Sequence, residues 1–354
     1  MKYYTGLTTD KGWYSLDKIL SYGRHLMIIT GKRSTGKSTG VALYLLLDYL
    51  QNGHGWIYTR RTQDETDLTA PDWFDNAAEI LTLAGIPAEV TYEKGKYKVN
   101  GEEAGFAIAL SQQQKYKGKN LSLAYWIVYD EFISFDGRYL GTKADPEKEY
   151  RSLMSMYQTA DRGIGKSQRN ETRIIALGNN DTYYNPLYMA LGIDRYIRAD
   201  THFLAPKGEE WVVQQLRPED AKNAEEYRES VGYKLSDERT KQYAYENMSK
   251  EEAADKSFIR RVSAPMVAAC NLIFDGVEMG VYCNYNEGYL YISSQKNGGQ
   301  TYALTAKDHK PNYFLLQSGS PQIKQVKFCY TQGKIVFENM RVKMALDNFF
   351  KFVV

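Results

Sequence analysis

The chain of 354 residues is 43% hydrophobic, which excludes a largely disordered protein, and it is long enough for two domains. Its 45 Lys and Arg against 43 Asp and Glu give a formal net charge of +2, so overall charge does not predict binding to nucleic acid. No run of about 18 apolar residues, no apolar signal core and no paired-cysteine motif is present, so we expect no membrane span, no secretion and no disulfide framework or zinc site.

Apolar segments typical of strands alternate with helical segments over the first 200 residues. Residues 90–110 predict two hairpins, with a Lys-Gly and an Asn-Gly turn. Near-continuous apolar strands that alternate with helices indicate a parallel sheet covered on both faces. Strands are expected at 25–30, 55–61, 123–132 and 172–180, and helices at 39–51 and 76–85.

The pattern changes in the second part of the chain. Residues 207–256 are dense in charge and poor in β-forming residues, which predicts a helical connector. From 257 onward the chain is β-rich, with antiparallel strands expected over 271–294, a hairpin over 325–339 and a short terminal helix. We therefore expect three domains, at 1–200, 201–256 and 257–354.

A phosphate-binding loop is predicted at residues 31–39, GKRSTGKST, which match the pattern G-x-x-x-x-G-K-[ST]. An expected strand precedes the loop and an expected helix follows it, as this motif requires. Lys37 should reach the terminal phosphates of ATP, and Ser38 should bind Mg²⁺. The residues expected to surround the nucleotide are Gly31, Arg33, Ser34, Thr35, Gly36, Lys37, Ser38 and Thr39.

Polar residues also follow two of the other expected strands. In WIVYDEF, Asp130 lies at the strand end, where it can hold Mg²⁺, and Glu131 can polarise the attacking water. In ALGNN, Asn179 is a candidate for sensing the γ-phosphate or that water. Solvated acids and a Gly-Asn turn are the alternative interpretations.

These segments together resemble a family. GKRSTGKST, IYTRR, ALSQQQKYKGKN, IVYDEF and IIALGNN occur in the order and spacing of the DNA-packaging ATPases of small protein-primed tailed phages, the phi-29 type. DKGWYSLDKIL (10–20) is similar to that family too, and residues after 257 resemble its C-terminal domain more faintly. Arg33 stands where packaging motors often have an arginine, which suggests a second cation directed at the phosphates.

The resemblance implies a fold and a function. The fold would be a P-loop NTPase of the additional-strand, conserved-glutamate (ring ATPase) type, with a helical linker and a smaller α+β, RNase H-like C-terminal domain without nuclease activity. The function would be to pump double-stranded DNA into a procapsid through a portal vertex in the host cell cytoplasm, as a ring that is a pentamer in the family. Relatives use a packaging RNA, and whether this chain does is left open.

Further residues are candidates for contacts with a neighbouring subunit or with DNA. The family places a trans-acting arginine before the ALGNN strand, and Arg162 matches best, with Lys166 and Arg169 as alternatives. Lys115, Lys117 and Lys119 predict an exposed basic loop that grips DNA phosphates without reading bases. Arg138 is a weaker DNA candidate, and Arg60 and Arg61 are expected either to order the phosphate loop or to contact DNA.

Two other functions stay open on sequence alone. A full large terminase would need a working nuclease, but Asp275, Glu278 and Asp347 do not form an obvious two-metal cluster of acids. A nucleotide-regulated DNA-binding assembly protein would use ATP to control assembly and not to pump.

Overall fold

The computed structural model divides the chain into two compact units, Met1–Lys250 and Glu251–Val354. The residues that the structure describes are 7, 13–135, 137–141, 147–162, 168–183, 185–197, 201–220, 230–238, 240–241, 259–315 and 320–353. Among the described helices, none combines the length and apolar character needed to cross a bilayer.

The N-terminal unit is built on a nine-stranded sheet of order β3-β4-β5-β2-β6-β7-β1-β9-β8. The strands from β5 to β9 in this order are parallel, and antiparallel strands extend both edges. The strands are β1 (Leu26–Thr30), β2 (Gly55–Thr59), β3 (Val90–Glu93), β4 (Lys96–Val99), β5 (Glu102–Ala107), β6 (Ala124–Asp130), β7 (Arg173–Gly178), β8 (Phe203–Leu204) and β9 (Trp211–Gln215).

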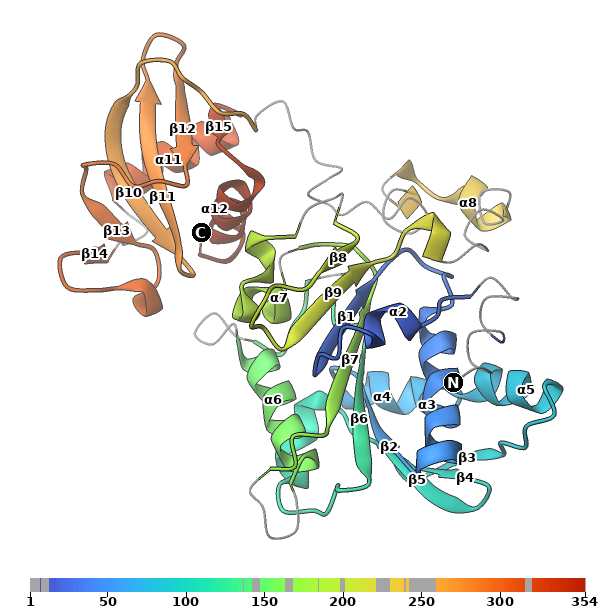
Figure 1. The fold of residues 1–354 in the computed structure, drawn as a ribbon. Helices are drawn as coiled ribbons and strands as arrows, with labels where there is room; N and C mark the ends of the chain where they lie inside the picture. Colours follow the sequence, from blue (N-terminus) through green and yellow to red (C-terminus); the bar gives the residue numbers. More distant parts are fainter. Residues whose placement is uncertain are drawn as a thin grey trace. The chain divides into compact units, whose positions relative to one another are not determined.

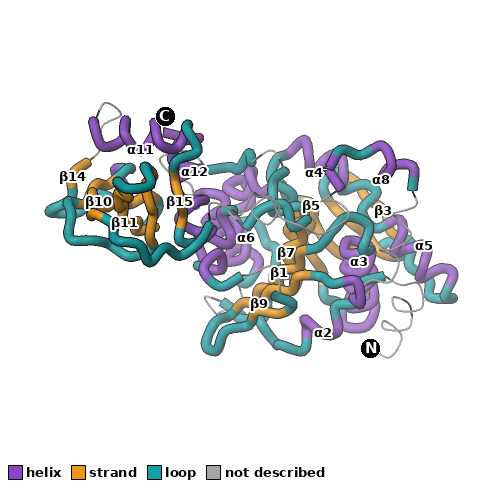
Figure 2. Tube along the Cα trace, turned by 90° about the horizontal axis from the view of Figure 1, so that it is seen from above, coloured by secondary structure: helices purple, strands orange, loops and turns teal. Residues whose placement is uncertain are grey.

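Helices cover both faces of this sheet, with α3 on one side and α6 on the other in two views (Figure 1 and Figure 2). Strands β1 and β2 are buried along their whole length and β6 is buried except at Tyr125, as the apolar runs in the sequence predict. The helices of the unit are α2 (Asp17–Leu20), α3 (Lys37–Asn52), α4 (Gln63–Thr69), α5 (Asp75–Leu83), α6 (Lys148–Ala160), α7 (Pro186–Leu191) and α8 (Val231–Leu235).

The strand order confirms the predicted fold type. Strand β7 lies between β1, which leads into the phosphate loop, and β6, which ends in Asp130. It is the additional strand of the class, and Glu131 follows β6 directly. The carboxyl ends of β2, β6, β7 and β1 therefore meet at one edge of the sheet, where α/β proteins bind ligands.

Two predicted segments are wrong. Residues 211–215, expected within a helical connector, form β9, because WVVQQ is fully buried and pairs in parallel with β1. Residues 325–339, expected as a hairpin, are mainly helical, with α11 (Pro321–Thr331) before β15 (Ile335–Phe337). Ser320 caps this helix through the Ile323 amide, and Pro321 occupies its first turn, where proline is tolerated.

The C-terminal unit has a mixed six-stranded sheet of order β14-β13-β10-β11-β12-β15. The first three strands in chain order, β10, β11 and β12, form the expected antiparallel meander. Helices α11 and α12 (Met340–Val353) contribute to the core of this unit. The α+β character is as predicted. The remaining strands are β10 (Val267–Phe274), β11 (Val277–Asn284), β12 (Tyr289–Ser293), β13 (Thr301–Ala303) and β14 (Phe314–Leu315).

The segment before α2 crosses the back of the phosphate loop. The Tyr14 amide donates to the Thr35 carbonyl at 3.2 Å, and the Tyr14 hydroxyl donates to Gln214 at 2.7 Å. The crossing is close, because a Cβ atom on Gly40 would lie 2.3 Å from the Tyr14 carbonyl oxygen. Glycine at position 40 thus permits the contact between this segment and α3.

We expect Gly40→Ala to destabilise the N-terminal unit by about 1–3 kcal/mol, because backbone must shift to admit the methyl group. Thermal unfolding followed by circular dichroism measures this. Gly298→Ala is the control, since a Cβ there meets no atom within 4 Å. Equal melting temperatures for the two variants would contradict the close crossing.

Candidate nucleotide-binding site

The phosphate loop connects the buried strand β1 to the start of α3. Ser34 and Gly36 have left-handed backbones, with φ of +62° and +73°. Such turns point successive amide groups into one concavity, and the N-terminus of α3 adds partial positive charge. The loop therefore has the form of an anion site.

A pocket of about 420 Å³ opens over this loop. It brings together every residue predicted for nucleotide or metal binding except Gly31, which is buried beneath Leu216. The pocket also includes Arg60, for which the sequence left two roles open, and Leu177 and Gly178, which no motif in the sequence indicated. Its lining residues are Arg33, Ser34, Thr35, Gly36, Lys37, Ser38, Thr39, Arg60, Asp130, Glu131, Leu177, Gly178 and Asn179.

Lys37 is buried at the floor of the pocket. Its ammonium donates to the carbonyls of Gly31 at 2.9 Å and Lys32 at 2.7 Å, and it lies 3.4 Å from Oδ1 of Asn179. Burial lowers the pKa of Lys37 to about 7, although the carboxylates of Asp130 and Glu131 oppose this shift. Near neutral pH the amine is therefore only partly protonated.

Asp130 and Glu131 come from the end of β6 and face Arg60. The Arg60 guanidinium lies 3.5 Å from Asp130 and 3.2 Å from Glu131. Burial raises the pKa of Asp130, and the positive charge of Arg60 opposes that rise. The oxygen atoms of Ser38 and Asp130 suit Mg²⁺, which prefers hard oxygen ligands together with water and phosphate.

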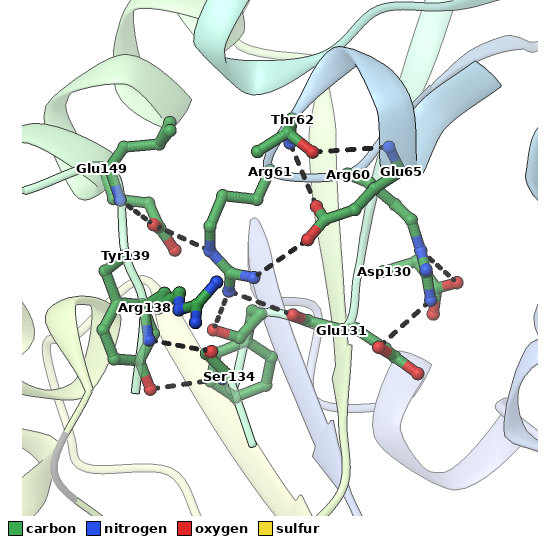
Figure 3. Close-up of polar contacts among 12 residues, drawn as sticks. Arg60, Arg61, Thr62, Glu65, Asp130, Glu131, Ser134, Arg138, Tyr139 and Glu149 are labelled. Atoms are coloured by element: carbon green, nitrogen blue, oxygen red, sulfur yellow. Dashed lines mark hydrogen bonds and ion pairs between the residues drawn. The ribbon is translucent and has the colours of Figure 1, made fainter. Parts of the chain in front are cut away.

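The structure corrects the assignment of Arg60 to DNA contact. Because β2 and β6 are parallel neighbours, the residues that follow their ends face each other. The side chain of Arg60 is only 16% exposed and is turned to the two acids (Figure 3). It belongs to the pocket, and this fits the other interpretation, that it orders the site.

Arg61 points away from Arg60, to the start of α6. It forms a buried ion pair with Glu149 at 3.0 Å, and it donates to the carbonyls of Glu131 and Phe132 (Figure 3). No pattern in the sequence links Arg61 to Glu149, which is 88 positions away. This contact could be found only from the fold.

The candidate DNA residues other than Arg60 lie outside the pocket. Lys115, Lys117 and Lys119 are exposed, at and after the 3₁₀ helix η1 (Leu110–Tyr116), and Arg138 is exposed as well. The amides of Leu110 and Ser111 donate to the carbonyls of Arg60 and Arg61, so the basic loop begins at the end of β2.

The candidate trans arginines differ in their surroundings. Arg162 is exposed just after α6, and Lys166 lies outside the described residues. Arg169 donates to the carbonyls of Ser122, Ala124 and Ala160, which does not fit a side chain that reaches a neighbouring subunit.

The three acids considered for a metal site, Asp275, Glu278 and Asp347, each pair with a lysine. Asp275 pairs with Lys307 at 3.3 Å, Glu278 pairs with Lys296 at 3.0 Å, and Asp347 pairs with a lysine on its own helix. Within the described part of the chain, no three His, Cys, Asp or Glu residues are grouped to hold a metal ion.

Residues 9–354 match the family of podovirus DNA encapsidation proteins (Gp16). The chain belongs to this family. The resemblance to packaging proteins of phi-29-type phages is thereby confirmed along nearly the whole sequence.

Individual members of the family are distant in sequence. The DNA packaging protein of Bacillus phage phi29 is 23% identical over 346 residues, which are 96% of this chain and 97% of the relative. That of Bacillus phage B103 is 24% identical over 343 residues, 94% and 98% of the two chains.

Solved structures share the fold of this family member. A chain of the bacteriophage Phi-29 viral genome packaging motor assembly matches with a TM-score of 0.73 and 21% identity, over 97% of this chain and 99% of that one. A chain of the Phi-28 gp11 DNA packaging motor matches with a TM-score of 0.62 and 16% identity, over 96% and 98%.

The lowered pKa of Lys37 predicts proton uptake on nucleotide binding. Above pH about 7 a growing fraction of the free protein carries a neutral Lys37, and phosphate raises the pKa of this amine again. ATP affinity should therefore fall by up to about tenfold per pH unit between about pH 7.5 and 9. Titration calorimetry in buffers of different ionisation enthalpy measures the protons taken up.

Lys37→Ala is the control for this titration. It should bind ATP weakly and without proton uptake, because the titrating amine is gone. Proton release, or a pH-independent affinity in the unmodified protein, would show that Lys37 is fully charged before the nucleotide binds.

Proposed function

We propose that this protein is an ATP-driven motor that moves double-stranded viral DNA into a procapsid through a portal vertex. The observation that carries the proposal is the pocket in which the phosphate loop meets Asp130 and Glu131, in a member of a DNA encapsidation family. The pocket supports ATP hydrolysis, and membership of the family supports DNA as the molecule that is moved.

The phosphate loop and its lysine hold the nucleotide. Loop amides and Lys37 would bind the phosphates, and Arg33 at the exposed rim is a second cation that can respond to loss of the γ-phosphate. Ser38 and Asp130 would hold Mg²⁺, which neutralises charge on the phosphates when it is bound. Burial of Lys37 keeps water from competing for its ammonium.

Glu131 is the proposed general base. Its side chain is 55% exposed at the mouth of the pocket, where water reaches it, and Asn179, which follows β7, lines the same pocket. The contact with Arg60 occupies one carboxylate oxygen. Turnover therefore requires that Arg60 yield this oxygen to the attacking water, or that the other oxygen take the proton.

The complete motor is proposed to be a ring, a pentamer by analogy with the family, that assembles at the portal in the host cytoplasm. Arg162 would reach the site of the neighbouring subunit and offset the charge of the transition state. Residues 1–200 together with β8 and β9 would be the ATPase domain, the rest of 201–256 the linker and 257–354 an inactive nuclease-like domain of RNase H type. A packaging RNA is a further partner to be tested.

The lysine loop is the proposed DNA contact. Lys115, Lys117 and Lys119 are exposed in one short segment and would bind the backbone of any duplex. Arg138 is a further exposed cation for the same role. Contacts of this kind give affinity without sequence preference, as packaging of a whole genome requires.

We expect double-stranded DNA of any sequence to stimulate ATP hydrolysis. The rate is measured against DNA concentration at about 50 and 200 mM salt, and stimulation should weaken at the higher salt because phosphate contacts are screened. Replacing Lys115, Lys117 and Lys119 with Gln should reduce the stimulation and leave the basal rate unchanged.

Glu131→Gln serves as the control for contaminating ATPases, since it should bind ATP and lose turnover by at least about 10²-fold. An ATPase rate that DNA leaves unchanged would contradict the motor. ATP-dependent filaments with slow hydrolysis would favour a nucleotide-regulated assembly protein instead.

Arg162→Ala tests the role of the neighbouring subunit. Alone, this variant should lose about 10³-fold in turnover, in the range known for arginine fingers. Mixed with Lys37→Ala subunits, which retain Arg162 but cannot use ATP, it should regain activity. Mixtures as inactive as either variant alone would assign the trans role elsewhere, and Arg169→Ala is the comparison variant.

A further inference from the structure

Arg61 and Glu149 form a buried ion pair beside the pocket but not in it. Their side chains are 8% and 3% exposed, and neither residue lines the pocket. Burying two charges is costly unless their geometry and hydrogen bonding are good, so the pair does not by itself imply a gain in stability. The hydrogen bonds that Arg61 makes to the turn at Glu131 suggest a function for the pair instead.

Arg61 holds the turn that carries the proposed general base. One terminal nitrogen of its guanidinium donates to the carbonyl of Glu131 at 3.2 Å and to the carbonyl of Phe132 at 3.1 Å. Glu131 has a left-handed backbone, with φ of +53°, a conformation that costs free energy for a residue other than glycine. Next along, the amide of Phe132 donates to the Leu177 carbonyl on β7.

Glu149 in turn holds Arg61. Its carboxylate accepts hydrogen bonds from Arg61, from the hydroxyl of Tyr129 on β6 and from the amide of Leu140, the last at 2.8 Å. Three separate segments thus orient this carboxylate, and it stands on the first turn of α6. The guanidinium is further covered by the ring of Tyr139, 5.1 Å away.

The two arginines at the end of β2 therefore bind different parts of one residue. Arg60 contacts the carboxylate of Glu131, which is free to change partners at the pocket mouth. Arg61 contacts the backbone of Glu131 from the buried side (Figure 3). The position of the Glu131 backbone limits where its carboxylate can lie in the pocket.

We propose that Arg61, oriented by Glu149, is a positioning residue that fixes the strained turn at Glu131 so that the carboxylate meets the attacking water. This inference rests on the proposed ATPase function and deepens it. Arg61 touches neither ATP nor water in this role, so its loss should change turnover and not nucleotide affinity.

Two variants remove the Arg61 contacts to the turn and leave every residue that lines the nucleotide pocket unchanged. Arg61→Lys keeps the charge but loses the planar fork, and a single ammonium cannot reproduce the bonds to Glu149 and to both carbonyls. Arg61→Met with Glu149→Gln removes both charges together, so no buried charge is left unpaired, and the amide can still bond Tyr129 and Leu140. Each should lower kcat by about 10–100-fold, the effect of a roughly 1 Å misplacement.

Asp48→Asn is the matched control. Asp48 is also a buried carboxylate of this unit, bonded to Trp126 and His54, but it lies near the far end of α3 from the phosphate loop. All variants are compared for kcat, for ATP affinity by titration calorimetry and for melting temperature. We expect ATP affinity within about twofold of the unmodified protein, and a kcat loss for the Arg61 variants that exceeds that of Asp48→Asn by at least about tenfold.

A double-mutant cycle with Glu131→Gln separates positioning from general damage. If Arg61 acts through Glu131, Arg61→Lys should cost less than about twofold in single-turnover hydrolysis once Glu131 is replaced. Effects that multiply, or a kcat no lower than that of Asp48→Asn, would overturn this inference and leave the proposed function standing. An unmodified protein without ATPase activity would overturn both.

Discussion

The site depends on one turn, at the point where β6 leaves the sheet. Five of the six β6 residues before Asp130 are buried, and the chain then turns through a left-handed residue, Glu131. The turn places consecutive carboxylates in different surroundings, since Asp130 is buried at the strand end and Glu131 is exposed. Such a turn persists only because its surroundings determine it: β7 binds the Phe132 amide, and Arg61 binds two of its carbonyls.

Lys37 and Arg60 already have polar partners within the pocket. Lys37 is bonded to loop carbonyls, and Arg60 is paired with Asp130 and Glu131. A buried charge without a partner would destabilise the fold. A nucleotide with its metal ion therefore competes with existing partners, and its affinity is the difference between two sets of contacts and not the sum of one.

Local patterns were enough to predict the parallel sheet and the pocket. The phosphate loop, Asp130 and Asn179 each follow an apolar strand, and parallel strands bring their carboxyl ends together. Other features depended on tertiary contacts. WVVQQ lies in a segment dense in charge, and only its pairing with β1 shows it to be a strand. Arg61 and Glu149 meet because β2 and α6 flank the same turn, which no spacing in the sequence encodes.

The crossing of Tyr14 over Gly40 has an evolutionary consequence. A side chain of any size at position 40 would collide with the backbone of position 14, so the clash cannot be relieved by changing Tyr14 to a smaller residue. Only a different path of the chain before α2 would make room. Whatever residue stands at position 14, descendants of this protein can therefore lose Gly40 only together with the route of the segment that crosses it.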